Sequence, residues 1–184
     1  MAVVICMLRG VNLGGNKKIK MDALRALCTS IGCADVRTFI NSGNVVFRTR
    51  QRDLRLLGKS IEDAIEKEAG FRAGVVLRSV REMKDAVARN PFGARKNIEP
   101  GKLLVNFLAD APSADTAKKL EALDTAPEEL YVRGREMYIY FSNGQGQSKL
   151  KWGPIDKLLN MTFTGRNWNT TTKLLEMAEM LEGD

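Results

Sequence analysis

The chain has 184 residues, of which 44% are hydrophobic and 28% charged, and it carries a formal net charge of +7. This length suits one domain of ordinary size or two small ones, and the apolar content is sufficient to form a core. The sequence contains no histidine. That absence excludes a catalytic triad, an imidazole general base and every histidine-containing metal site.

The positive charge is concentrated in the first half of the chain. Residues 1–100 hold 19 Lys and Arg against 10 Asp and Glu, whereas residues 101–184 hold 10 against 12. Such an asymmetry attracts nucleic acid, phosphorylated metabolites or an acidic surface, although solubility alone would also account for it.

Cysteine usage and hydropathy indicate the cellular compartment. Cys6, Cys28 and Cys33 lie in or beside apolar patterns and lack CxxC spacing, as reduced core cysteines do. No apolar run approaches the ~20 residues of a membrane span, and the short N-terminal run lacks the basic region of a signal peptide. We therefore expect a soluble, cytoplasmic protein with no metal site, no cofactor and no membrane partner.

The first half of the chain alternates strands and helices. Hydrophobic periodicity and turn residues predict, in order, a strand at 3–8, a helix at 21–31, strands at 36–40 and 44–48, a helix at 54–69 and a strand at 75–77. This β-α-β-β-α-β order is that of the ferredoxin-like fold. A connecting helix is expected at 80–88.

The second half repeats this order. The predicted elements are a strand at 103–108, a helix at 113–123, strands at 130–132 and 137–141, a helix at 148–159, a short strand at 161–164 and a last helix at 170–181. The fold class is therefore α+β, with a ferredoxin-like subdomain at 1–89 and a related βαββα(β) unit plus C-terminal helix at 102–184. Residues 90–101, with two prolines and two glycines, are the predicted linker.

The first strand of each predicted subdomain is an almost unbroken apolar run. A sheet that is open to water on one face would alternate apolar and polar residues instead. Something must therefore cover the second face of each sheet. The other subdomain or a second copy of the chain could do so, which makes a homo-oligomer one possibility.

A glycine-rich loop follows the first strand at one edge of the predicted sheet. The crossover rule brings the hairpin between the second and third strands to the same edge. Backbone N–H groups and cationic side chains can hold an anion there, although the spacing matches neither a Walker loop nor GxGxxG. The candidate binding residues are Arg9, Gly10, Asn12, Gly14, Gly15, Lys17, Ser42 and Asn44. Alternatively, the glycines serve only turn geometry and the lysines are solvated.

A second candidate segment precedes the last predicted helix and contains Arg166, Asn167, Trp168 and Asn169. Arg166 could act as a bidentate fork for phosphate or carboxylate, and Trp168 as a stacking face. Alternatively, Asn169 or Thr170 is the N-cap of the helix and Trp168 packs on one of its leucines.

Tyr138 and Tyr140 share one face of a predicted strand, as the aromatics of an RNA-binding sheet do. The sequence departs from the RNA-recognition signature at Arg135 and Glu136, and two tyrosines on one face of a strand more often pack against a helix.

The candidate loops contain no isolated carboxylate pair, which disfavours acid–base hydrolysis.

Four motifs resemble those of the bacterial family known as domain of unknown function 1697. They are Leu8-Arg9-Gly10-Val11-Asn12-Leu13-Gly14-Gly15, Ser42-Gly43-Asn44-Val45-Val46-Phe47, Asn90-Pro91-Phe92 and Arg166-Asn167-Trp168-Asn169-Thr170. The resemblance implies two α+β subdomains, the first of them ferredoxin-like, and it implies no activity. The family's motifs include both candidate segments.

We therefore expect the protein to bind an anionic or phosphorylated small molecule or a nucleotide through its Arg/Asn/Gly-rich loop. One alternative is nucleic-acid binding on a sheet surface through the basic first half and the tyrosines. Another is an enzyme that stabilises charge with Arg, Asn and Ser donors, because such an activity needs no histidine.

Overall fold

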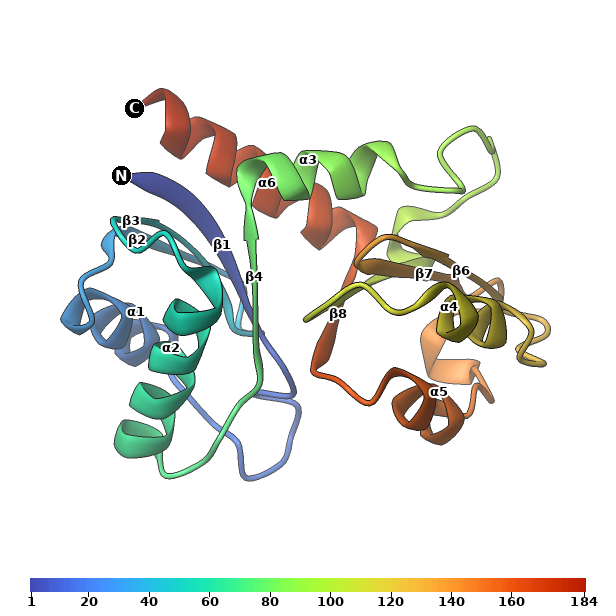
Figure 1. Cartoon of the computed structure of the whole chain (residues 1–184), viewed down its shortest axis with the longest axis horizontal. Coiled ribbons are helices and arrows are strands. Elements are labelled where there is room, and N and C mark those ends of the chain that lie inside the picture. The colour runs from blue at the N-terminus through green and yellow to red at the C-terminus, as the bar shows by residue number, and fades with distance from the viewer. The chain divides into compact units, whose positions relative to one another are not determined.

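The computed structural model describes residues 1–184, which form two compact units. The first unit comprises Met1–Asp85 together with Lys173–Asp184, and the second comprises Ala86–Thr172. Each unit contains one four-stranded antiparallel sheet (Figure 1). The predicted α+β fold with two related subdomains is therefore confirmed.

The first sheet has the strand order β2-β3-β1-β4, which is the ferredoxin-like order. The elements are β1 (Ala2–Leu8), α1 (Met21–Ser30), β2 (Ala34–Phe39), β3 (Asn44–Thr49), α2 (Leu54–Ala69), β4 (Val75–Ser79) and α3 (Val80–Ala88). Helices α1 and α2 lie on the same face of this sheet (Figure 1).

Local sequence signals set the ends of these helices. The Asp53 carboxylate accepts hydrogen bonds from the N–H groups of Arg55 and Leu56 at the start of α2, and the helix ends at Gly70 with φ 74°. Ser79 and Glu82 form a reciprocal capping box, which starts α3 directly after β4.

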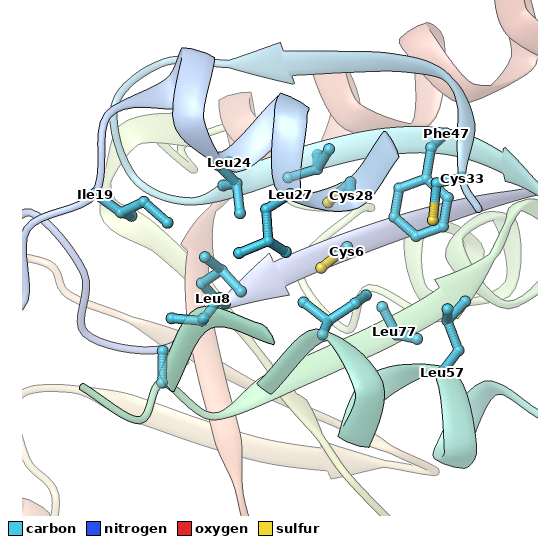
Figure 2. Close-up of a cluster of buried hydrophobic side chains, with 14 of the residues drawn as sticks. Cys6, Leu8, Ile19, Leu24, Leu27, Cys28, Cys33, Phe47, Leu57 and Leu77 are labelled. Atoms are coloured by element: carbon cyan, nitrogen blue, oxygen red, sulfur yellow. The ribbon is translucent and has the colours of Figure 1, made fainter. Parts of the chain in front are cut away.

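The core of the first unit lies between the sheet and helices α1 and α2. Val4, Cys6 and Leu8 of β1 point into it beside residues of both helices, as Figure 2 shows for Cys6 and Leu8. Val3 and Met7 on the opposite face of β1 are also buried. Strand β1 is thus buried on both faces, as its unbroken apolar run predicts.

The C-terminal helix α6 (Trp168–Gly183) ends in the first unit. The last turn of α6 contacts β3, because Arg48 Nη2 donates to the Leu181 carbonyl at 2.6 Å. The residue that follows the helix contacts β2, because Arg37 Nη2 lies 2.8 Å from Asp184 Oδ2. No helix of the chain combines the length and apolar character needed to cross a membrane.

The cysteines of this core should make the protein less stable in alkali. Burial raises the pKa of the Cys28 thiol to about 12, with a smaller contribution from Cys33, and burial raises the pKa of Cys33 to about 11. Unfolded thiols lose their protons above pH ~8.5, so the unfolded state binds fewer protons there and the free energy of unfolding falls as pH rises.

We expect each of these two thiols to contribute a slope of about −1.4 kcal/mol per pH unit above pH ~9. Urea unfolding of wild type and Cys28→Ala at pH 8, 9 and 10 measures the slope. The variant should lose stability less steeply than wild type between pH 9 and 10. Equal slopes would show that Cys28 ionises as readily in the folded chain as in the unfolded one.

The second sheet has the order β6-β7-β5-β8 and repeats the topology of the first. Its unit contains β5 (Leu103–Leu108), α4 (Ala114–Glu121), β6 (Glu129–Arg133), β7 (Glu136–Tyr140), α5 (Trp152–Leu159) and β8 (Phe163–Asn167), with 3-10 turns at Pro100–Lys102 and Gln145–Gln147. The repeat extends to register: Leu8 pairs with Val75 in the first sheet, and Leu108 pairs with Phe163 in the second.

Strand β8 is shifted relative to the prediction, which placed it at 161–164. It runs from Phe163 to Asn167 because it pairs with β5 as far as Asn167, although the sequence Gly165-Arg166-Asn167 has little β propensity. Asn167 Oδ1 then accepts a hydrogen bond from the N–H of Thr170 at 2.9 Å. Asn167 is therefore the N-cap of α6, and the prediction of Asn169 or Thr170 in that role is wrong.

Two helices of the second unit are shorter than predicted. Helix α4 ends at Glu121 rather than at residue 123, and α5 begins at Trp152 rather than at residue 148. Ser148 belongs to a turn instead, in which its hydroxyl accepts a hydrogen bond from the N–H of Leu150. The prediction made both helices too long because the apolar spacing continues beyond their observed ends.

Residues 90–101, which the sequence predicts to be a linker, pack within the second unit. The Phe92 side chain is buried against the rings of Tyr131 and Tyr140, with centroid distances of 5.4 and 5.7 Å. Arg95 forms a bidentate ion pair with Glu129, with both N–O distances 2.7 Å. The compact units accordingly divide between residues 85 and 86, ahead of this segment.

Candidate functional site

The connection between β1 and α1 is much longer than the fold requires. It comprises twelve residues, 9–20, whereas the equivalent connection between β5 and α4 comprises five, 109–113. Residues 9–20 contain four Lys and Arg and no Asp or Glu. The first unit thus carries a long basic loop, here called the β1–α1 loop, where its internal repeat has a short turn.

The structure brings this loop to the sheet edge that the topology predicts. The N–H of Leu8 donates to the Gly43 carbonyl at 2.9 Å, and the N–H of Arg9 donates to the Gly74 carbonyl at 2.8 Å. The end of β1, the β2–β3 hairpin and the segment before β4 therefore meet at one edge.

Asn12 ties the β1–α1 loop to itself and to the hairpin. Its Oδ1 accepts from the N–H of Ile19 at 3.0 Å, and its Nδ2 lies 2.9 Å from the Ile19 carbonyl oxygen. Nδ2 also donates to the carbonyl and to Oδ1 of Asn41, at 3.1 and 3.0 Å. Asn12 adopts φ 57°, a left-handed conformation that asparagine tolerates better than most residues. Its amide is thus used to hold the loop.

The hairpin residues also use their polar groups internally. Asn44 is fully buried, and its Nδ2 donates to the Phe39 carbonyl at 3.2 Å and to Ser42 Oγ at 2.8 Å. Asn44 is the first residue of β3, so its side chain closes the turn rather than facing solvent. Ser42 remains partly exposed.

The cations around the loop differ in how far they are neutralised. Arg72 contacts three carboxylates of α2 at 2.8–3.2 Å, those of Glu62, Asp63 and Glu66, and its hydrogen bond with Glu66 is the main reason that its pKa is raised. Lys17 Nζ donates to the Arg72 carbonyl at 3.0 Å. Lys18 is exposed and forms no ion pair, and Gly14 and Gly15 beside it are exposed as well.

The second candidate segment lies in the other unit and is not a loop. Arg166 is a buried residue of β8, and its Nη1 donates to Thr164 Oγ1 and to the Gly165 carbonyl, both at 2.8 Å. Asn167 caps α6, Trp168 is the first residue of that helix and is half-buried, and Asn169 is exposed. The Arg9 and Arg166 segments thus belong to different units.

The internal repeat identifies one buried residue that the sequence analysis missed. Arg78 pairs with Ile5 in the first sheet as Arg166 pairs with Val105 in the second, and Arg78 is completely buried. Each arginine is the last but one residue of its strand, directly before a capping residue and a helix. An alignment of the two halves of the sequence would have shown this equivalence.

The tyrosines of β7 provide no surface for stacking. Tyr138 is fully buried, and its hydroxyl donates to the Ala86 carbonyl at 2.6 Å. Tyr140 is 8% exposed and packs against Phe92. Base stacking requires an accessible ring face. The burial of the tyrosines therefore removes one of the two observations behind the nucleic-acid-binding alternative and leaves only the basic first half of the chain.

The cysteines are free and buried. No group of three or more His, Cys, Asp or Glu side chains is arranged to hold a metal ion.

Comparisons with known proteins identify the family and the fold. A model of the family described as protein of unknown function (DUF1697) matches residues 1–138. The solved structure of the conserved bacterial protein SP0830 from Streptococcus pneumoniae is similar, with a TM-score of 0.76, 22% identity, and coverage of 97% of this chain and 99% of that chain. This likeness shows the fold. Comparison with curated proteins gives no match.

Proposed function

The chain belongs to the DUF1697 family, and we propose that its first unit binds an anionic small molecule, such as a phosphorylated metabolite, at the β1–α1 loop. The observation that carries this proposal is the length and charge of the loop. It has seven residues more than its counterpart in the second unit, and its four Lys and Arg have no acidic neighbour within it. Neither feature is needed to build the fold.

The contacts around the loop support binding without large rearrangement. Asn12 fixes both ends of the loop and joins it to the hairpin, so little conformational entropy is lost when a ligand binds. Lys18 supplies an exposed charge, and Arg9 is partly exposed at the start of the loop. Exposed Gly14 and Gly15 lack side chains that would keep an anion away from the backbone N–H groups.

Pyrophosphate titration by calorimetry tests the proposal. A charge-assisted hydrogen bond contributes about 1.5–3 kcal/mol, so Lys18→Ala should weaken pyrophosphate binding by roughly tenfold or more. The melting temperature should stay within a degree or so of wild type, because Lys18 makes no ion pair. Lys59→Ala, which removes an exposed lysine of α2, is the matched control and should bind like wild type.

Two outcomes would contradict the proposal. One is the absence of pyrophosphate binding to wild type at millimolar concentration. The other is an equal loss of affinity in the Lys18 and Lys59 variants, which would indicate a general effect of net charge. A salt titration adds a further check, since contact with many phosphates gives a steep dependence on salt and a single small anion does not.

A further inference from the structure

We infer that the ligand of the β1–α1 loop is a nucleotide, with its phosphates at the basic loop and its base against Leu13 and Ile40. This inference rests on the proposed function and names the class of its ligand. An anion site alone would not require exposed apolar side chains beside it.

Leu13 and Ile40 are large apolar residues with unusually high exposure. The exposed fraction is 78% for Leu13 and 53% for Ile40, whereas most leucines and isoleucines of the chain are buried. Leu13 lies within the β1–α1 loop, and Ile40 is the first residue of the hairpin turn between β2 and β3. Single exposed apolar residues are ordinary, but here one lies within the basic loop and the other in the hairpin turn to which that loop is hydrogen-bonded.

Hydrogen bonds fix the backbone next to both residues. Asn12 Nδ2 donates to the carbonyl and to Oδ1 of Asn41, at 3.1 and 3.0 Å. Leu13 follows Asn12 in the chain, and Ile40 precedes Asn41. The two apolar residues are therefore attached to the two sides of a single hydrogen-bonded junction.

Ile40 also adopts a conformation that is unfavourable for its residue type. Its φ is 46°, in the left-handed region that β-branched residues avoid. Asparagine or glycine would fit this backbone with less strain, and either would avoid exposing a large apolar side chain. The left-handed backbone of Ile40 therefore costs folding free energy, and strained residues of this kind concentrate at binding sites.

The size of the surface favours a small organic anion over a macromolecule. Two side chains offer far less than the ~800 Å² that each partner buries in a standard protein interface. They are also too few for the apolar face of a membrane-bound helix. A nucleotide combines phosphate charge with a flat base that one or two aliphatic side chains can cover, and the four Lys and Arg of the loop complement its charge.

Calorimetric titration with ADP and with pyrophosphate tests the inference, because the two probes share a diphosphate and differ in the nucleoside. Wild type should bind ADP at least tenfold more tightly than pyrophosphate. Leu13→Ser and Ile40→Asn should each reduce this preference to threefold or less and leave the affinity for pyrophosphate unchanged. Leu56→Ser is the matched control, since Leu56 is an exposed leucine of α2.

The melting temperature of the Ile40→Asn variant gives a second readout, independent of binding. Asparagine relieves the left-handed strain, so its melting temperature should equal or exceed that of wild type while its preference for ADP falls. A loss of stability together with loss of binding would indicate a merely structural role for Ile40 and overturn its assignment to the base.

The outcomes also separate this inference from the proposed function. Equal affinity of wild type for ADP and pyrophosphate would overturn the nucleotide assignment and leave the anion site standing. An unchanged preference for ADP in both variants would likewise overturn the contact with Leu13 and Ile40. Binding of neither probe would overturn the proposed function, and the inference with it.

Discussion

Replacing Gly43 with alanine should lower the free energy of unfolding by about 3 kcal/mol or more, because two separate costs combine. The residue has φ 72°, which costs an alanine about 1–2 kcal/mol. An added Cβ would also lie 2.7 Å from Leu8 Cβ and 2.7 Å from Val11 Cγ2, both in the buried core. Overpacking of this kind typically costs a further 1–3 kcal/mol.

Gly14→Ala is the control that separates the two costs. Gly14 has φ 86°, but a Cβ added there would meet no atom within 4 Å. We expect this variant to lose only the backbone contribution, about 1–2 kcal/mol. Urea unfolding followed by circular dichroism measures both variants. Equal losses would mean that the close approach of the hairpin to Leu8 is not what requires glycine at Gly43.

The order of elements could be predicted because local pattern and topology rules are sufficient for it. The apolar run of β1, the helical spacing of α1 and α2 and the turn at the hairpin each identify an element without tertiary information. Crossover handedness then places the end of β1 beside the hairpin. The hydrogen bond from the Leu8 N–H to the Gly43 carbonyl shows the result at atomic detail.

Features that depend on distant partners could not be predicted in this way. Strand β8 continues to Asn167 because β5 lies beside it. Residues 90–101 belong to the second unit, where Phe92 packs on the rings of Tyr131 and Tyr140, which lie far along the chain. Prolines and glycines are typical both of linkers and of irregular segments that pack against a sheet. Composition therefore does not distinguish the two cases.

The candidate site shows the same limit at the level of side chains. Asn12 and Asn44 are predicted to be binding residues because the topology brings the glycine-rich loop and the hairpin to one edge of the sheet. In the structure both amides bond to nearby backbone, as short polar side chains at turns often do. Residue type alone does not reveal whether an amide faces a ligand or the chain itself.

Asn12→Ala should reduce the free energy of unfolding by about 3 kcal/mol and also weaken anion binding. The Asn12 side chain accepts from the N–H of Ile19 and donates to Asn41, and at a net ~1 kcal/mol each, these two bonds account for about 2 kcal/mol. The left-handed φ of 57° adds about 1 kcal/mol for alanine.

Asn12→Gly separates these contributions, since glycine keeps the backbone conformation and loses only the hydrogen bonds. We expect Asn12→Gly to lose about 2 kcal/mol, less than Asn12→Ala. Both variants should bind pyrophosphate more weakly than wild type, although neither removes a charge. Without the Asn12 hydrogen bonds the β1–α1 loop is less ordered, and ordering it on binding reduces the affinity. Wild-type stability in both variants would show that Asn12 does not hold the loop. Wild-type affinity in clearly destabilised variants would place the anion outside the β1–α1 loop.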